Sequence, residues 1–288
     1  MKDHLVRVAT QDGTLRATAA VTTELVDAIC RRQGTDPTAS VALGRLVTGT
    51  ALMGSLLKGD QRLALMIEGN GPVKKLHAET DALGQVRGSV KEPISGIAPT
   101  ETGFDVPAAI GRAGFLHVVK DLGLKEPYRG MVQLYSSEVA EDLAYYLTSS
   151  EQVPSTVALG VYLEKDGRIS AAGGLLVQAL PEGEEALIAL LEERLVALPP
   201  ITTLLRDGKG PRQIIEELFA GIPLGRNEET PLVFRCTCSR SQVLGMLKTL
   251  GEEELKDMAA KDEQTSVVCE FCKERYSFSS DEIKALIA

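Results

Sequence analysis

The stretches Phe234-Arg235-Cys236-Thr237-Cys238-Ser239 and Val268-Cys269-Glu270-Phe271-Cys272 decide how the last fifth of this 288-residue chain can fold. They contain four of its five cysteines, in two close pairs separated by thirty residues. Four soft sulfur ligands are what a tetrahedral zinc ion requires. The same thiols can instead form two short local disulfides, so one site has two chemical states. We therefore predict a zinc site with four ligands, which are Cys236, Cys238, Cys269 and Cys272.

The surroundings of these cysteines bear on their reactivity. Cys238 is expected at the start of a helix, where the helix dipole favours thiolate. Basic residues near the two pairs act in the same direction; they are Arg235, Arg240, Lys273 and Arg275. Peroxide converts a thiolate to sulfenic acid and then to a disulfide with a neighbouring thiol. Oxidation is therefore expected to remove the ligands, release zinc and unfold the module that zinc stabilises. A purely structural zinc site is the alternative.

Residues 232–288 are expected to form this small terminal module. Its large apolar side chains are few, and units of this size usually need a metal or a disulfide. Two helices, at about 239–250 and 252–261, fill the spacer between the cysteine pairs. A standard zinc ribbon has a shorter spacer of about 15–20 residues. Ser280 is expected to cap a last helix.

Residues 180–231 differ in character from the rest of the chain. About −5 of the formal net charge of −9 falls there. Helices are expected at about 184–198, 201–206 and 211–220, and short helices are marginal unless an apolar face docks elsewhere. The first helix carries such a stripe, made of Leu187, Ile188, Leu191, Leu195 and Leu198. We interpret the segment as a metastable helical linker, with a stable helical subdomain as the alternative.

Residues 1–179 predict a mixed α/β core, of the α+β class with antiparallel and mixed sheets. Alternating strands and turn signals favour hairpins too often for a purely parallel sheet. Strands are expected at about 5–9, 15–19, 63–67, 73–79, 86–90, 115–120, 130–135, 156–164 and 169–180. Helices are expected at about 23–33, with Thr22 or Thr23 as the cap, at 37–58 and at 138–148. Small residues on the inner face of the second helix predict close packing.

Composition limits the function classes. The amino terminus shows no apolar signal segment, and no stretch is long and apolar enough for a membrane span, so we expect a cytoplasmic protein without a membrane partner. Cytoplasmic thiols are kept reduced, which favours metal or redox chemistry over structural disulfides. No region is basic, which argues against nucleic acid as a partner. Cys30 is expected to be a half-buried structural thiol. His4, His77 and His117 lack the spacing of a metal site or triad, and no catalytic constellation is found, so we expect no enzyme.

The cysteine pattern, in this order at the end of a chain of this length, resembles the redox-regulated 33 kDa heat-shock chaperonin family. Stretches further upstream carry the same resemblance over essentially the whole chain. They are Pro37-Thr38-Ala39-Ser40, Lys58-Gly59-Asp60, Glu68-Gly69-Asn70-Gly71-Pro72, Val119-Lys120-Asp121-Leu122-Gly123 and Ser149-Ser150-Glu151-Gln152-Val153-Pro154-Ser155.

The resemblance implies a molecular chaperone that binds unfolding client proteins without ATP. It implies that the reduced, zinc-bound form is inactive. Oxidation then forms the disulfides Cys236–Cys238 and Cys269–Cys272, releases zinc and unfolds the linker and terminal module. Client-binding surface is exposed, and the active form is a homodimer. Two rival functions remain: a zinc-ribbon nucleic-acid-binding module, and a thiol oxidoreductase that uses Cys269 and Cys272.

Overall fold

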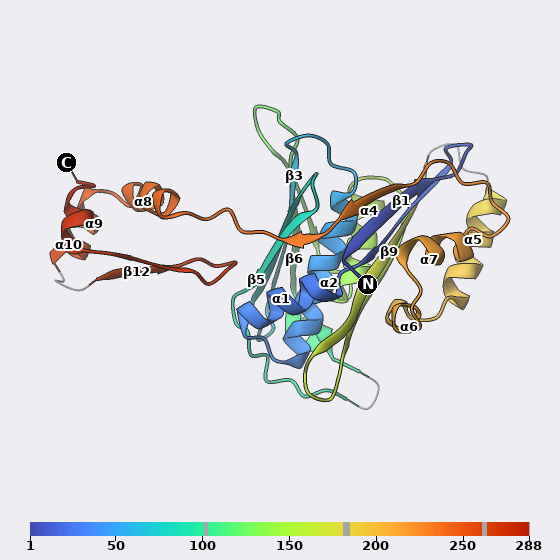
Figure 1. The fold of residues 1–288 in the computed structure, drawn as a ribbon, viewed down its shortest axis with the longest axis horizontal. Coiled ribbons are helices and arrows are strands. Elements are labelled where there is room, and N and C mark those ends of the chain that lie inside the picture. The colour runs from blue at the N-terminus through green and yellow to red at the C-terminus, as the bar shows by residue number, and fades with distance from the viewer. Residues whose placement is uncertain (101–102, 181–184, 261–263, 288) are drawn as a thin grey trace. The chain divides into compact units, whose positions relative to one another are not determined.

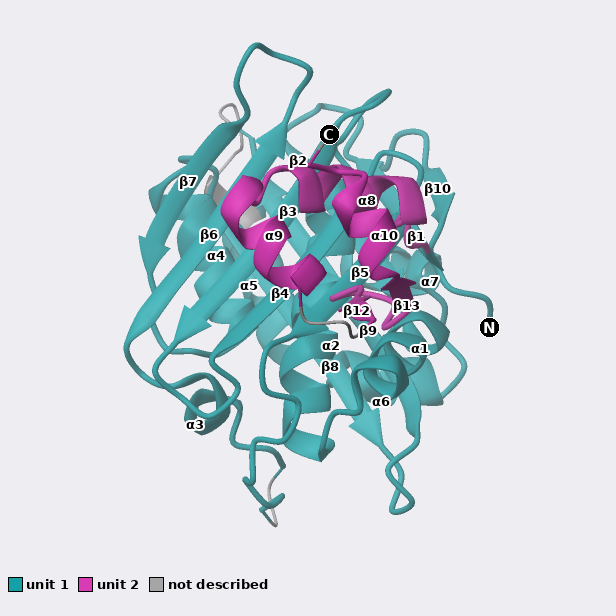
Figure 2. Ribbon diagram, turned by 90° about the vertical axis from the view of Figure 1, so that its left-hand side faces the viewer, with its two compact units in different colours: residues 1–234 teal, residues 235–288 magenta. Residues whose placement is uncertain are grey.

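A computed structural model describes residues 1–100, 103–180, 185–260 and 264–287. The chain forms two compact units, residues 1–234 (unit 1) and residues 235–288 (unit 2), as Figures 1 and 2 show. Each unit has hydrophobic clusters of its own. Within the described ranges, no helix has both the length and the apolar character that a membrane crossing needs.

Unit 1 contains two β-sheets. Its strands are β1 His4–Ala9, β2 Leu15–Val21, β3 Arg62–Gly69, β4 Lys75–Asp81, β5 Gln85–Val90, β6 Gly114–Asp121, β7 Tyr128–Gln133, β8 Ser155–Leu163, β9 Ile169–Ala179, β10 Glu228–Pro231 and β11 Val233–Phe234. The first sheet has the order β10-β1-β2-β9-β8, and the second has the order β11-β5-β4-β3-β6-β7. All neighbours are antiparallel except β11, which runs parallel to β5. The predicted mixed α/β class, with antiparallel and mixed sheets, is confirmed.

The helices of unit 1 lie on both faces of the first sheet. They are α1 Thr23–Gln33, α2 Pro37–Gly54, α3 Val106–Ile110, α4 Val139–Ser149, α5 Glu185–Ala197, α6 Ile201–Arg206 and α7 Pro211–Leu218. Helix α2 packs between the two sheets, because it contacts β8 and β9 of one and β3 to β5 of the other. Helices α5 to α7 lie over the opposite face of the first sheet.

The interior strand β9 shows why this sheet needs cover on both sides. Successive side chains of a strand point to opposite faces. In β9, Ala172 and Leu176 belong to the main cluster that includes α1 and α2, whereas Leu175 and Val177 belong to the cluster under α5 to α7. A strand that is apolar on both faces must be buried on both faces.

Small residues let α2 approach its neighbours closely, as the sequence predicts. A methyl group at Gly49 would lie 2.4 Å from Leu143 Cδ1, and one at Gly54 would lie 2.3 Å from the Thr80 side chain. The helix begins with Asp36, whose carboxylate accepts a hydrogen bond from Ala39 N at 2.8 Å. It ends at Gly54 rather than near Lys58, because the chain turns away where Gly54 meets β4.

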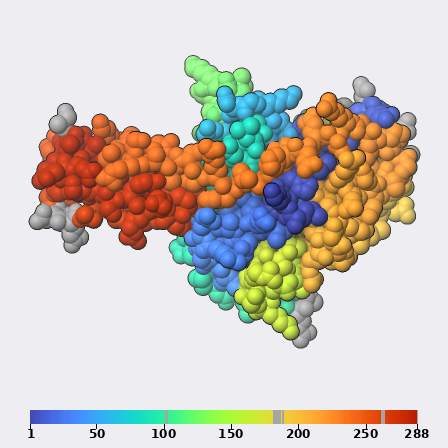
Figure 3. Space-filling model, viewed as in Figure 1, coloured from blue at the N-terminus to red at the C-terminus, as the bar shows by residue number. Residues whose placement is uncertain are grey.

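Helices α5 to α7 occupy the predicted linker segment. Leu191 of α5 is buried, and Leu187, Leu195 and Leu198 pack half-buried against the same cluster. The expected helix start at Glu184 and the side chain of Ile188 lie outside the described residues. In the space-filling view, the orange segment that carries α7 lies against the dark blue N-terminal strand (Figure 3). The apolar stripe thus has a docking partner in the outer face of the first sheet, while the metastability of the segment stays a prediction.

Unit 2 is a small α+β unit. Its elements are α8 Arg240–Lys248, α9 Glu252–Ala260, β12 Thr265–Val268, β13 Arg275–Phe278 and α10 Ser280–Lys284. Strands β12 and β13 form an antiparallel hairpin. Among the residues of unit 2 that the structure describes, the buried cluster has six members, which are Val243, Leu247, Leu255, Ala259, Phe278 and Ile283. Such a small core supports the expectation that a further source of stability is needed.

Two local predictions for this part of the chain need correction. The cap of α10 is Ser279 rather than Ser280: the Ser279 hydroxyl accepts from Glu282 N at 3.3 Å, and Glu282 accepts in return from Ser279 N at 2.9 Å. Residues 232–234, expected in the terminal module, fold with unit 1. Val233 and Phe234 pair with Gln85 and Val86 at the edge of the second sheet, so the module begins three residues later than expected.

Candidate metal centre

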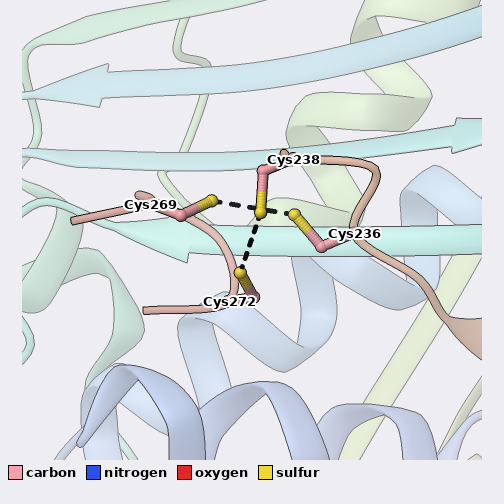
Figure 4. Close-up of side chains that lie close together, drawn as sticks. All are labelled: Cys236, Cys238, Cys269 and Cys272. Carbon is pink, nitrogen blue, oxygen red and sulfur yellow. Dashed lines mark hydrogen bonds between the residues drawn. The ribbon is translucent and has the colours of Figure 1, made fainter. Parts of the chain in front are cut away.

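The structure brings the four predicted cysteines together in unit 2. Their sulfur atoms all lie within 4.8 Å of one another. Cys236 Sγ lies 3.7 Å from Cys269 Sγ, and Cys238 Sγ lies 3.3 Å from Cys272 Sγ. Figure 4 shows the four side chains pointing toward a common centre. Zinc–sulfur bonds of about 2.3 Å in a tetrahedron place the sulfurs about 3.8 Å apart. The donor set and its spacing therefore fit zinc.

Two short loops hold the cysteines in place. Cys236 and Cys238 lie on an extended segment that ends at Ser239, whose hydroxyl caps α8 by accepting from Gln242 N at 3.3 Å. Cys269 and Cys272 lie in the turn between β12 and β13. There Cys269 N donates to Glu274 O at 2.8 Å, and Lys273 N donates to Cys269 O at 3.0 Å. The hairpin thus presents two sulfurs on one side, which is the usual form of a zinc half-site.

The thiols differ in their electrostatic environments. Burial raises the pKa of Cys238, and it raises the pKa of Cys272 to about 12. Burial also opposes ionisation of Cys269, but the backbone N–H groups of Cys272 and Phe271 outweigh it and lower the pKa of that thiol to about 7. The expectation that the start of α8 favours thiolate at Cys238 is therefore wrong. Because four thiolates this close repel one another, a bound cation is needed to keep them all ionised.

The basic residues near the cysteines mostly serve the fold or face solvent. Arg240 donates to Glu282 at 2.5 Å and to the Ser277 carbonyl oxygen at 2.7 Å, and its guanidinium lies 4.3 Å from the centre of the Phe278 ring. Arg235, Lys273 and Arg275 are exposed. Solvent and salt screen exposed charges, so the predicted effect of these residues on the thiols is small.

Sequence reasoning missed one contact of the centre. The Tyr276 hydroxyl lies 3.2 Å from Cys238 Sγ. This hydrogen bond is the main reason that the pKa of Tyr276 is raised, so the phenol keeps its proton. The only signal in the sequence is that Tyr276 follows the second cysteine pair by four residues. Nothing in that spacing says that a hydroxyl reaches back to the first pair.

The other residues singled out from the sequence lie apart from the centre. Cys30 is fully buried rather than half-buried, its thiol contacts Ser40 O at 3.7 Å, and burial raises its pKa to about 12. His4, His77 and His117 lie on β1, β4 and β6. Among the residues that the structure describes, the four cysteines form the one group of three or more His, Cys, Asp or Glu side chains close enough to share a metal ion.

Comparison with known proteins connects this architecture to one family. The model of the Hsp33 protein family matches residues 3–279. The 33 kDa chaperonin of Geobacter sulfurreducens is 52% identical over 284 residues, which cover 99% of this chain and 94% of that protein. The 33 kDa chaperonin of Citrifermentans bemidjiense is 49% identical over 288 residues, which cover 100% and 98%. The crystal structure of the 33 kDa chaperonin of Thermotoga maritima, a heat shock protein 33 homologue, aligns with a TM-score of 0.90 at 36% identity, covering 99% of this chain and 97% of that one.

Proposed function

This chain belongs to the Hsp33 family, and we propose that it is a redox-regulated chaperone that binds unfolding proteins under oxidative stress without ATP. The observation that carries the proposal is the convergence of four cysteine sulfurs within 4.8 Å inside a unit with a very small core. The names of the relatives support the chaperone class. The chemistry of the cysteine centre supports the regulation.

In the reduced state, Cys236, Cys238, Cys269 and Cys272 hold Zn²⁺ as four thiolates. The ion supplies no reaction; it neutralises the thiolates and adds its binding free energy to the folding of unit 2. One cysteine pair lies at the start of unit 2, and the other lies in the turn between β12 and β13. Fixing them to one point closes the unit around its six buried apolar side chains.

Oxidation changes the bonds that the sulfurs can make. A thiolate attacks peroxide, the O–O bond breaks, hydroxide leaves, and the sulfur becomes a sulfenic acid after losing two electrons. The thiolate of the neighbouring cysteine then attacks that sulfur, forms the disulfide and displaces a second hydroxide. We propose the disulfides Cys236–Cys238 and Cys269–Cys272. Each sulfur that is oxidised is lost as a thiolate ligand, so zinc is released as oxidation begins, before the local disulfides form.

The proposed disulfides are not the ones that the folded unit would form most directly. The short sulfur contacts run between the pairs, Cys236 with Cys269 and Cys238 with Cys272. Once the ion leaves and unit 2 opens, only cysteines that are near in sequence stay close to each other. Local disulfides are therefore expected from an opened unit, whereas disulfides between the pairs are expected from a unit that stays folded.

Opening of unit 2 is proposed to loosen the linker through two short edge strands. β10 and β11 join α7 to unit 2 along the chain, and they contribute four and two residues to the edges of the two sheets. Short edge strands release few hydrogen bonds when they fray. Release of α5 to α7 then exposes both their apolar stripe and the outer face of the first sheet, which together form the proposed client-binding surface.

The finer features of the proposal follow from the same chemistry. Reduced thiols at pH 7 suit the cytoplasm, and we propose that location. The partners are unfolded proteins rather than nucleic acid, in keeping with the net charge of −9. Exposed apolar surface also favours self-association, so we propose a homodimer in the oxidised, active state. We propose no enzymatic turnover.

The test treats the reduced, zinc-loaded protein with peroxide at mild heat and follows zinc release and the aggregation of an unfolding client. We expect zinc release and the suppression of client aggregation to rise together in the wild type and in Cys30→Ser. Suppression of client aggregation without zinc release would contradict the proposal. Salt-dependent binding to DNA or RNA would favour the nucleic-acid module, and repeated reduction of disulfides would favour the oxidoreductase.

A further inference from the structure

We propose that Tyr276 is a positioning residue of the redox centre: its hydroxyl donates a hydrogen bond to the Cys238 sulfur, while its ring fixes that contact to the core of unit 2. The inference rests on the proposed zinc switch. It adds a residue that sets how firmly the centre holds its metal and how readily Cys238 is oxidised.

The geometry ties Tyr276 to both the centre and the core. Its hydroxyl oxygen lies 3.2 Å from Cys238 Sγ. Its ring packs against the buried cluster of unit 2, beside Phe278, which lies two residues further along the same face of β13. Opposite Tyr276 in the hairpin stands Val267, which packs against the same cluster. The packed ring thus anchors the phenol beside the sulfur.

The hydrogen bond has only one possible direction when the centre is loaded. A zinc-bound cysteine is a thiolate and has no proton to give. The phenol must then be the donor, and a hydrogen bond to an ionised acceptor is about twice as strong as one between neutral groups. Partners of this kind orient a metal ligand and tune its reactivity.

Tyr276 is unusual among the groups that contact the four sulfurs. Backbone N–H groups of Phe271, Cys272 and Glu274 serve the second cysteine pair. Cys238 instead receives a hydrogen bond from a side chain. Any turn of this shape supplies backbone donors. The phenol is present only because position 276 is a tyrosine. A single substitution can therefore remove this hydrogen bond without changing the loop.

Two effects on the centre follow from this contact. The hydrogen bond withdraws negative charge from Cys238 and makes the sulfur a weaker nucleophile toward peroxide. It also joins the first cysteine pair to β13, so that loss of the metal and loss of the core are coupled. Removing the hydroxyl alone should weaken metal binding and speed oxidation while the ring keeps its packing.

The test compares Tyr276→Phe with Tyr145→Phe, which removes an exposed phenol on α4 in unit 1. Competition against a zinc chelator should show affinity about 10-fold lower for Tyr276→Phe, at the lower end of the effects seen for such partners. Zinc release by peroxide should be faster. In the cobalt-loaded protein, the sulfur-to-metal charge-transfer band should shift. Tyr145→Phe should match the wild type in all three.

The outcomes separate this inference from the proposed function. If the wild type binds no zinc, the proposed switch fails and this inference with it. If the wild type binds zinc but Tyr276→Phe keeps the same affinity, release rate and cobalt spectrum, the switch stands and the role of Tyr276 is refuted. A role in packing alone would leave the charge-transfer band unmoved, because phenylalanine keeps the ring.

The unaltered protein offers a second measurement should Tyr276→Phe fold poorly. Ultraviolet resonance Raman spectroscopy distinguishes a phenol that donates a hydrogen bond from one that does not. We expect one tyrosine to lose its donor signature when zinc is removed from the reduced wild type. Identical tyrosine spectra in the two states would refute the proposal.

Discussion

Replacing Leu191 with alanine should release α5 from unit 1 without unfolding the core. Leu191 is 2% exposed, and it is the one fully buried side chain among the α5 residues whose burial is described. It packs in the cluster that contains Leu15 and Val177. A lone helix of this length is marginal in water. Its docking therefore depends on Leu191, on the half-buried leucines beside it, and on the hydrogen bond from Arg194 to Leu218 O at 2.8 Å.

The size of the effect follows from the surroundings of Leu191. Leu→Ala replacements in buried sites cost about 2–5 kcal/mol. A cleft of about 250 Å³ borders Leu191, so water can fill the space left behind and the cost should lie near the lower end, at about 2–3 kcal/mol. If that cost falls on local opening, the open population of α5 rises about 30- to 150-fold, since 1.4 kcal/mol is tenfold.

Hydrogen exchange by mass spectrometry measures this opening directly. Peptides from α5 should lose protection by that factor under reducing conditions, while β2 and β9 keep theirs. Val196→Ala is the matched control, because Val196 lies on the same helix and is 89% exposed. If the stripe holds the chaperone inactive, reduced Leu191→Ala should also suppress client aggregation. Unchanged exchange in α5, or equal loss in β9, would refute the reasoning.

Three further predictions concern the metal and one buried carboxyl. Cys272→Ser should lose zinc in a chelator titration, because a hydroxyl is a poor ligand beside three thiolates; zinc retained as in the wild type would remove Cys272 from the ligand set. Chelation of zinc under reducing conditions should abolish exchange protection in α8 to α10 and lower it in α5 to α7, while β2 and β9 keep theirs; protection that persists in α8 to α10 would show that unit 2 folds without metal. Burial raises the pKa of Asp3 from 3.8 to about 6, so its ionised form costs stability above that pH, and the cost disappears as the pH falls below about 4. The free energy of unfolding of the wild type and of Asp3→Asn should be measured by denaturation at each pH. As the pH falls from 7 to 4, the wild type should gain up to about 3 kcal/mol relative to the variant. A difference that does not change with pH would contradict the raised pKa.

The sequence predicts a helix or hairpin well where its own residues determine its structure. The hairpin of β8 and β9 and helices α1, α4 and α6 lie within a residue or two of their expected positions. Long-range pairings could not be predicted. The parallel pairing of β11 with β5 joins Val233 to Gln85, and no local pattern encodes it. The start of α1 is similar: Thr22 makes no side-chain cap, and Asp3 accepts from Leu25 N at 2.6 Å instead.

The candidate metal centre likewise has features that the local sequence predicts and features that depend on the fold. Four cysteines in two pairs predict the ligands, because few other roles use four thiols so spaced. The ionisation of each thiol was not predictable, since it depends on burial and on backbone N–H groups that only the folded turn positions. Burial raises the pKa of Cys238, which was expected to ionise readily, whereas backbone N–H groups lower the pKa of Cys269. The phenol of Tyr276 likewise joins the centre only through the register of a hairpin.

The build of the first sheet shows how the proposed client-binding surface can be stored inside a stable fold. Strand β9 carries Leu175 and Val177 on the face under α5 to α7, so this face must be covered by something apolar. Its inner face and its strand pairings do not depend on that cover, because α1 and α2 bury the opposite side. The cover is the most acidic segment of the chain, and repulsion among its carboxylates is predicted to weaken its docking. If the cover docks as weakly as predicted, the sheet can lose it and remain a sheet, because α1 and α2 still pack against its other face; the proposed surface for unfolded proteins requires this.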